Sequence, residues 1–267
     1  MPGRLDLMYK IAIGWLALLI VLAAGATWLP LPDPLALDLS GSLAAPSTRH
    51  LAGTDELGRD VLSRLLHAAR STLLIVVGAS ALALAIATIL GGLAGYLGGW
   101  LDRAVRVGID LFWSVPFVIF VVLIISVVGV SVTSLIVTIG IINWVGPARV
   151  IRAEAARLRD ADFVVAARAH GYSRPFILAR EVVPNLHRTL LTLAAYGAIE
   201  VLTLETGLAF LGLSLPAPRP TWGGMLADGL GYFSSAWWVV IGTSAFVTMT
   251  LGSLQVIARR EETARSA

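Results

Sequence analysis

The richest concentration of residues that could do chemistry lies in one polar stretch, residues 149–188, between segments apolar enough to span a membrane. Eight of the nineteen arginines fall in it. The chain has no cysteine, and its four histidines, His50, His67, His170 and His187, show no HExxH-type ligand spacing. The sequence therefore predicts neither thiol chemistry nor a metal site.

The single lysine, Lys10, limits what the chain can do with nucleotides. A Walker A loop needs Gly-Lys-Ser/Thr around the phosphates, so ATP hydrolysis would have to come from another polypeptide. A membrane-embedded enzyme would need a nucleophile or metal constellation, and no Ser-His grouping occurs at membrane depth. We expect a non-catalytic chain that binds no cofactor of its own.

Two carboxylates, Glu200 and Glu205, interrupt a long apolar segment. An ionisable group at membrane depth usually faces protein or a water-filled path. Being five residues apart on a helix, the two point about 140° away from each other, which argues against one carboxylate pair. A pathway role and a structural role between helices both remain open. Asp110, at the entrance of another apolar segment, is a third candidate, with a helix-terminus or interfacial role as its alternative.

The composition predicts an all-α, polytopic membrane protein, because 57% of residues are hydrophobic and 14% charged, against roughly 45–50% and 25% in globular proteins. The 38 uncharged residues between Asp110 and Arg149 would form a helix of about 57 Å, too long for one crossing of a ~30 Å hydrocarbon core. We place a turn at 129–131 and a kink at Pro116. The six predicted spans are 11–29, 72–97, 108–128, 132–148, 189–213 and 237–258.

The distribution of basic residues predicts how the chain is oriented in the membrane. Fifteen of the twenty basic residues, Arg4 and Arg265 among them, fall on the side of both termini, which indicates cytoplasmic termini. Four arginines in the first outer loop (Arg49, Arg59, Arg64 and Arg70) oppose this locally. The net charge of +3 is thus explained by membrane orientation and not by nucleic-acid binding. A cleaved signal peptide is the alternative for residues 11–29.

Small residues and helix signals predict the local structure around these spans. Gly91, Gly92 and Gly95 should allow close helix contact in the second span. An interfacial helix is expected over residues 54–70, capped by Thr54. Its apolar face would be Leu57, Val61 and Leu65, opposite Arg59, Asp60 and Arg64.

The polar stretch 149–188 predicts two helices. The first runs from Val150 to His170 and ends at Gly171, in the left-handed conformation. The second is capped by Ser173, with Pro175 in its first turn and Pro184 bounding it. The first helix carries a stripe of mostly small residues, Phe163, Ala166, Ala167 and His170. A helical hairpin lying on the membrane surface is the alternative.

The spacing in this stretch resembles the EAA loop of bacterial ABC importer permeases, in which Glu-Ala-Ala is followed after three residues by Gly and thirteen later by Pro. Ala166, Ala167, Gly171 and Pro184 fall in that register. Val165 stands in place of the motif's Glu, Glu181 in place of Ile and Val183 in place of Leu. The longer run is similar to the dipeptide, oligopeptide and nickel branch: Asp162, Phe163, Val164, Ala166, Ala167, Arg168, Ala169, Gly171, Pro184 and Asn185.

Two further strings are similar to the same branch. One precedes the second span and contains Gly53, Thr54, Asp55, Gly58, Arg59 and Asp60. The other runs from Glu205, five residues before Phe210-Leu211-Gly212, to Trp222, Gly223 and Leu226. The carboxyl-terminal end departs from the family, since residues 252–255 replace its usual polar Gly-Asp-containing ending.

The resemblance implies a type I ABC importer transmembrane domain in a bacterial inner membrane. Residues 1–71 would form a first span plus an external segment, and residues 72–267 the permease domain with its coupling loop at 149–188. Implied partners are a second related permease, two ATPase subunits, separate or fused, that carry ATP and Mg, and an external solute-binding protein. The expected cargo is di- or oligopeptides, with nickel chelates or haem as alternatives. A secondary transporter is the alternative of a different class, although no inverted repeat is evident.

Overall fold

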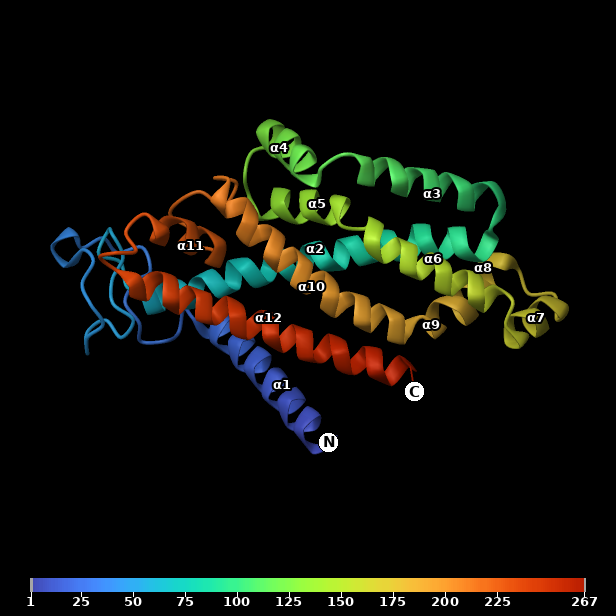
Figure 1. The fold of residues 1–267 in the computed structure, drawn as a ribbon, viewed down its shortest axis with the longest axis horizontal. Coiled ribbons are helices and arrows are strands. Elements are labelled where there is room, and N and C mark those ends of the chain that lie inside the picture. Colours follow the sequence, from blue (N-terminus) through green and yellow to red (C-terminus); the bar gives the residue numbers. More distant parts are fainter. Residues whose placement is uncertain (1, 267) are drawn as a thin grey trace. The chain divides into compact units, whose positions relative to one another are not determined.

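The computed structural model describes residues 2–266, and their side chains from residue 6 to residue 263. The described chain is helical and contains no strand, only an isolated bridge between Thr54 and Asp60. Figure 1 labels the helices. They are α1 (Pro2–Gly25), η1 (Leu39–Gly41), α2 (Val61–Leu97), α3 (Gly99–Ser114), α4 (Phe117–Val128), α5 (Val132–Ile142), α6 (Val145–Arg159), α7 (Asp162–Ala169), α8 (Arg174–Ile177), a π-helical turn η2 (Leu178–Val182), α9 (Val183–Asn185), α10 (His187–Phe210), α11 (Trp222–Leu230) and α12 (Trp237–Ser266).

Four helices, α1, α2, α10 and α12, are long and apolar enough to cross a membrane. Two bent pairs, α3 with α4 and α5 with α6, bring the number to six if each pair is one span. The all-helical polytopic fold predicted from composition is confirmed. Arg4 and Arg265, which entered the charge count, have side chains outside the described residues.

Pro116 does more than kink its span. The axes of α3 and α4 differ by 84°, and Val115 between them is extended, with φ −107° and ψ 130°. A residue before proline is disfavoured in the α region, so the helix ends there instead of bending. The turn expected at 129–131 is confirmed, because α4 ends at Val128, Gly129 has φ +81° and α5 begins at Val132.

The chain forms two compact units. The first unit comprises Met1–Val76, Val130–Thr133 and Leu202–Ile257, and the second comprises Val77–Gly129, Ser134–Val201 and Ala258–Ala267. The domain boundary predicted between residues 71 and 72 lies within α2 and stays a prediction.

Close backbone packing holds the second unit together. A Cβ built at Gly91 would lie 2.7 Å from the carbonyl oxygen of Ala148 on α6, and one at Gly95 would overlap the carbonyl oxygen of Arg152. Gly92, by contrast, has nothing within 4 Å of its Cβ position. The small-residue contact predicted for this helix therefore involves Gly91 and Gly95 but not Gly92.

We expect Gly95→Ala to destabilise the second unit, because the added methyl group would overlap a carbonyl oxygen and push α2 and α6 apart. Overpacking a fitted contact costs about 1–3 kcal/mol. Gly92→Ala is the matched control on the same helix, and it should be neutral or slightly stabilising, since alanine favours helix. Thermal unfolding of both variants in detergent tests this, and equal midpoints would contradict it.

The first unit joins α1, α11 and α12 to the external segment, defined as residues 26–60. Trp222, fully buried at the start of α11, donates its backbone N–H to Thr72 Oγ1 at 3.2 Å and its indole N–H to the carbonyl oxygen of Leu65 at 3.1 Å. Trp15 on α1 donates to Thr250 Oγ1 on α12 at 3.2 Å. No helix was predicted from the sequence between the spans 189–213 and 237–258, where α11 lies.

The prediction of a separate interfacial helix over residues 54–70 was wrong. α2 begins at Val61 and continues unbroken to Leu97. Asp60, and not Thr54, caps the amino terminus of α2, since Oδ1 of Asp60 accepts the free backbone N–H of Ser63 at 2.8 Å. The face expected to be polar and exposed is buried, with Arg59 8% and Arg64 5% exposed, because the external segment folds over it.

Candidate functional site

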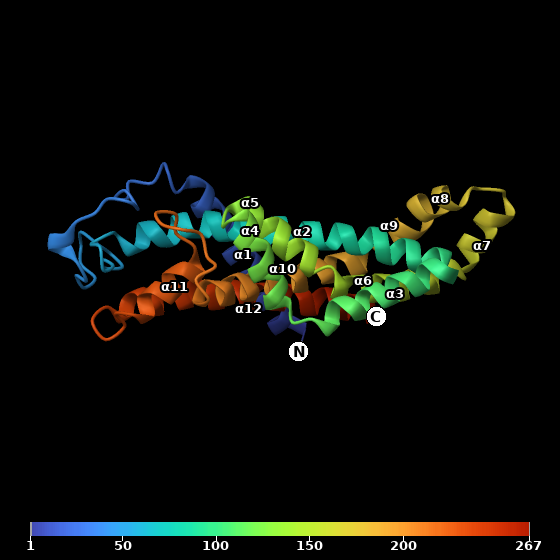
Figure 2. The same cartoon turned by 90° about the horizontal axis from the view of Figure 1, so that it is seen from above.

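The polar stretch 149–188 folds as a chain of short helices at one end of the second unit, where α7 and α8 follow α6 in both views (Figures 1 and 2). The prediction of a single helix from Val150 to His170 was wrong, because α6 ends at Arg159 and a separate helix, α7, begins at Asp162. Ala161 between them is extended, with φ −72° and ψ 147°. A side-chain hydrogen bond from Arg159 lowers the pKa of Asp160 at this break.

The next turn follows the prediction more closely. Gly171 has φ +81°, the left-handed conformation expected where α7 ends. Ser173 occupies the amino-terminal cap of α8, although its side chain makes no capping hydrogen bond, and Pro175 lies in the first turn. A π-helical turn, Leu178–Val182, then leads to α9. The loop is thus a series of bends.

Buried apolar residues anchor these helices to the rest of the second unit. Val164, Ile177 and Val182 are fully buried in one core. That core also contains Ile151, Ala155 and Leu158 of α6 and Tyr96 of α2. The position of α7 is therefore tied to the helices that continue into the spans.

Several apolar side chains are exposed on α7, on α8 and in the turn between them. Phe163 is 40% exposed, Val165 50%, Tyr172 54% and Phe176 43%, and Ala166 lies among them along the chain. The rings of Tyr172 and Phe176 stack, with centroids 4.8 Å apart and planes 16° apart. We call these five residues the coupling patch. Sequence reasoning missed the aromatic pair, although its i, i+4 spacing was a usable signal.

The residues predicted for ATPase coupling fall in this region. Asp162, Phe163, Ala166, Arg168 and Gly171 are exposed on or beside α7, and Ala167 is half-buried against the core. The side chain of Arg168 donates to the carbonyl oxygen of Arg159. Pro184 and Asn185 lie in α9, where Asn185 donates to the carbonyl oxygen of Glu181 at 2.6 Å.

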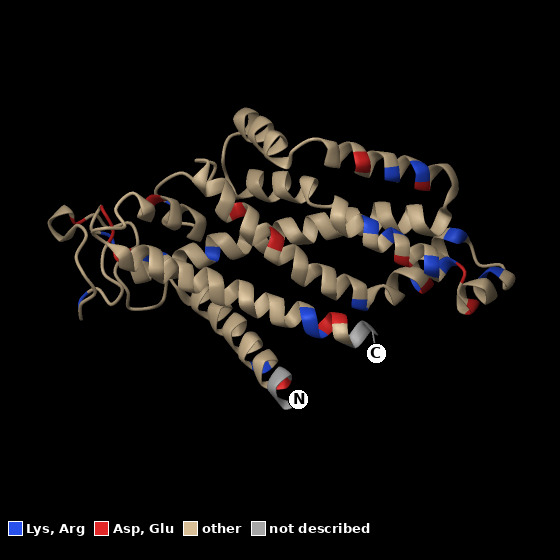
Figure 3. Cartoon of the chain, viewed as in Figure 1, with Lys and Arg blue, Asp and Glu red and all other residues tan. Residues whose placement is uncertain are grey.

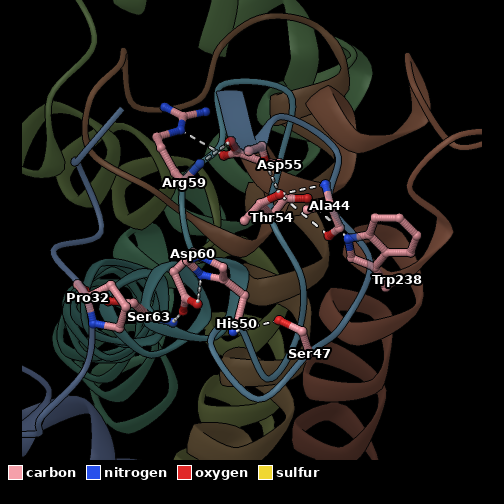
Figure 4. A network of polar contacts seen from close by, with 11 residues as sticks. Pro32, Ala44, Ser47, His50, Thr54, Asp55, Arg59, Asp60, Ser63 and Trp238 are labelled. Atoms are coloured by element: carbon pink, nitrogen blue, oxygen red, sulfur yellow. Dashed lines mark hydrogen bonds and ion pairs between the residues drawn. The ribbon is translucent and has the colours of Figure 1, made fainter. Parts of the chain in front are cut away.

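The predicted external signature is a buried polar network in the first unit (Figure 4). Asp55 Oδ2 accepts from Nε of Arg59 at 2.7 Å and lies 3.2 Å from Nε of Arg64. Asp60 Oδ2 lies 2.9 Å from Nδ1 of His50. Burial, reinforced by Asp55, raises the pKa of Tyr232. The network fixes the external segment on the start of α2.

Thr54 and two glycines complete this network. Thr54 Oγ1 accepts the backbone N–H of Ala44 at 2.7 Å, and the carbonyl oxygen of Thr54 accepts the indole N–H of Trp238 at 3.1 Å. Gly53 and Gly58 have φ of +73° and +72°. A Cβ at Gly53 would lie 2.5 Å from the Trp238 indole nitrogen, and one at Gly58 would overlap the backbone of Asp38.

The candidate pathway carboxylates occupy different environments. Acidic residues occur within α10 (Figure 3), and these are Glu200 and Glu205. Glu205 is 1% exposed, and among the described residues neither of its carboxyl oxygens has a hydrogen-bond partner. Glu200 is exposed and has Asn143 as its partner. Asp110 Oδ1 accepts from Arg149 at 2.9 Å, and the Arg149 guanidinium lies 4.5 Å from the Trp113 ring centroid.

Glu205 packs against the first turn of α11, since a Cβ at Gly223 would lie 3.1 Å from its Oε2. We expect Glu205→Gln to retain most transport, because glutamine keeps the size and polarity of the side chain. Glu205→Leu should impair assembly, because it replaces the carboxyl group that packs against the polar amino-terminal end of α11 with an apolar side chain. Assembly by size-exclusion chromatography and uptake test this. Loss of uptake by the glutamine variant with normal assembly would favour a charge-dependent pathway role.

Comparison with known proteins places this architecture in a family. The model for the binding-protein-dependent transport system inner membrane component matches residues 87–262. The chain is 30% identical over 252 residues to the dipeptide transport system permease protein of Bacillus subtilis (strain 168), covering 93% of this chain and 79% of that protein. It is 35% identical over 227 residues to the nickel transport system permease protein of Escherichia coli (strain K12), covering 84% and 80%.

A relative from Brucella suis biovar 1 (strain 1330) is 36% identical over 199 residues, and the match spans 74% of this chain but only 66% of the relative. The chain belongs to the family of binding-protein-dependent transport system inner membrane components. It is therefore a multi-pass permease component of the inner membrane, as the EAA-like spacing had predicted.

Proposed function

We propose that this chain is the non-catalytic permease subunit of an ATP-driven importer and forms half of a pathway for di- or oligopeptides. The exposed coupling patch carries the proposal, in a chain whose relatives include a dipeptide transport permease. An apolar, partly aromatic surface at the end of a membrane protein is suited to a partner protein. The partner is an ATPase that holds ATP and Mg.

The other half of the pathway is a second, related permease subunit. Two ATPase subunits, separate or fused, bind the coupling loops on the cytoplasmic side, where both termini lie. A solute-binding protein delivers cargo from outside to the external segment. We expect the chain itself to bind no cofactor, metal or nucleic acid, since its single lysine, Lys10, lies outside any Walker A loop.

Reconstitution tests this proposal. The purified chain alone should give neither ATP hydrolysis nor uptake in proteoliposomes, whereas the complete set of subunits should give both. The ATPase should co-purify with this chain. Uptake driven by an ion gradient through the single subunit would instead establish a secondary transporter.

Nickel chelates are the second candidate cargo, because a nickel transport permease is among the relatives. Competition uptake with di- and oligopeptides, nickel chelates and haem in a deletion strain distinguishes the cargoes. We expect peptides to enter and to compete. Entry of a metal chelate or haem without competition by peptides would exclude the peptide assignment.

A further inference from the structure

Asn143 and Glu200 meet inside the second unit. Asn143 is 8% exposed and lies with Trp144 in the short connection between α5 and α6. With its amide nitrogen directed at α10, Nδ2 donates to Oε1 of Glu200 at 2.8 Å and lies 3.3 Å from Oε2. The amide therefore fixes the direction in which the carboxylate points.

Glu200 lies near the middle of α10, about 20 Å along the helix axis from His187. Its side chain is exposed on this chain, whereas Glu205 is 1% exposed. Within the described part of the chain no Lys, Arg or His forms an ion pair with Glu200. An amide supplies a hydrogen bond but no compensating charge. A carboxylate at this depth with a free side is expected to face a water-filled path.

The position of this pair connects it to the coupling loop. α6 leads from Asn143 and Trp144 towards α7, and α10 begins two residues after α9. Trp144 belongs to the same core as Val182 and Leu186 of the loop. Movement of the loop would therefore change how Asn143 and Glu200 lie relative to each other.

We propose that Glu200, oriented by Asn143, binds the terminal ammonium group of a peptide cargo in the pathway. Peptides differ in their side chains, but the α-amino group, with a pKa of about 8, is common to them and is largely protonated at pH 7. One carboxylate can thus bind many cargoes through charge-assisted hydrogen bonds. Because this contact would change when the coupling loop moves, it also permits release of the peptide. This inference rests on the proposed peptide importer.

Uptake by the complete importer in proteoliposomes tests the role of the charge. Glu200→Gln keeps an acceptor for Asn143 and removes the charge, so we expect KM for peptide to rise about tenfold. Glu200→Asp should recover part of the wild-type KM, and Asn143→Leu should raise KM by a smaller factor. Glu262→Gln, on α12, is the control and should leave KM unchanged. ATPase co-purification should be normal in all four variants, which shows that the importer assembles, and basal hydrolysis should be unchanged in the Glu262→Gln control.

A labelling experiment tests access to water without depending on cargo affinity. Because the chain has no cysteine, Glu200→Cys gives it a single thiol. We expect this thiol to react with a charged methanethiosulfonate reagent, and the reaction to slow when peptide is being transported. Glu205→Cys, at a buried position, should not react. Mass spectrometry of this chain separates its labelling from that of its partners.

The outcomes separate the two proposals. If the wild-type assembly neither transports peptide nor hydrolyses ATP, the proposed function fails. If the wild type transports peptide but Glu200→Gln has an unchanged KM, or Glu200→Cys is unreactive, the importer stands and the role of Glu200 is overturned.

Discussion

Asp55→Asn is expected to destabilise the first unit by about 3–5 kcal/mol, because it would leave two buried guanidinium groups without their counter-ion. Arg59 and Arg64 both contact Oδ2 of Asp55, and their side chains are 9% and 6% exposed. Oδ1 also accepts the backbone N–H groups of Leu57 and Arg59, at 2.9 and 3.0 Å. Asparagine could keep some of these hydrogen bonds but none of the charge.

Hydrogen exchange and limited proteolysis of the external segment measure this effect. We expect residues 38–60 to lose protection in Asp55→Asn while the second unit keeps its protection. Asp33→Asn is the matched control. Asp33 is exposed and accepts one backbone N–H, from Leu35 at 2.9 Å, so its replacement should change little. Equal protection in the two variants would show that the network does not hold the segment.

Ala166→Glu is expected to abolish ATPase binding, or to reduce it at least tenfold, while leaving the chain folded. Ala166 is exposed on α7 and belongs to the coupling patch, so the added carboxylate would meet solvent in the free chain but a closely packed surface in the complex. Ala153→Glu, at an exposed position on α6, is the control and should bind normally. Val165→Ala should be mild, because the valine side chain is half exposed.

Gly171→Val tests the geometry of the same loop without adding bulk to a contact. Nothing lies within 4 Å of a Cβ at Gly171, but its φ of +81° costs a residue with a Cβ about 1–2 kcal/mol. Relief of that strain would redirect α8 and uncouple hydrolysis from transport. Gly129→Val is the comparison: Gly129, with φ +81° and ψ 166°, also has open space around its Cβ position, so a valine there imposes at least as much strain in the turn between α4 and α5.

Pull-down of the ATPase and substrate-stimulated hydrolysis in proteoliposomes are the measurements for these variants. Normal values for both Ala166→Glu and Gly171→Val would mean that the loop is only a surface hairpin. Uncoupling by Gly129→Val as well would mean that any strained turn disturbs transport, and the special role of Gly171 would be lost.

Sequence alone determined the features that depend on local chemistry and on the solvent. A run of apolar residues too long for one crossing had to turn, and the turn at Gly129 was found because glycine tolerates a positive φ. Gly171 was placed for the same reason. The motif spacing around Ala166 and Pro184 was sufficient to indicate the family, since it depends only on the order of residues.

The tertiary structure alone decided which residues are buried and which meet. The external segment covers Arg59, Asp60 and Arg64, so a face that periodicity assigned to solvent became a buried ion network. Glu200 and Glu205 have the same chemistry and share a helix, yet the first turn of α11 covers only Glu205, while Asn143, 57 residues away in the chain, orients Glu200. Burial and pairing are set by segments distant in sequence, whose approach no local pattern records.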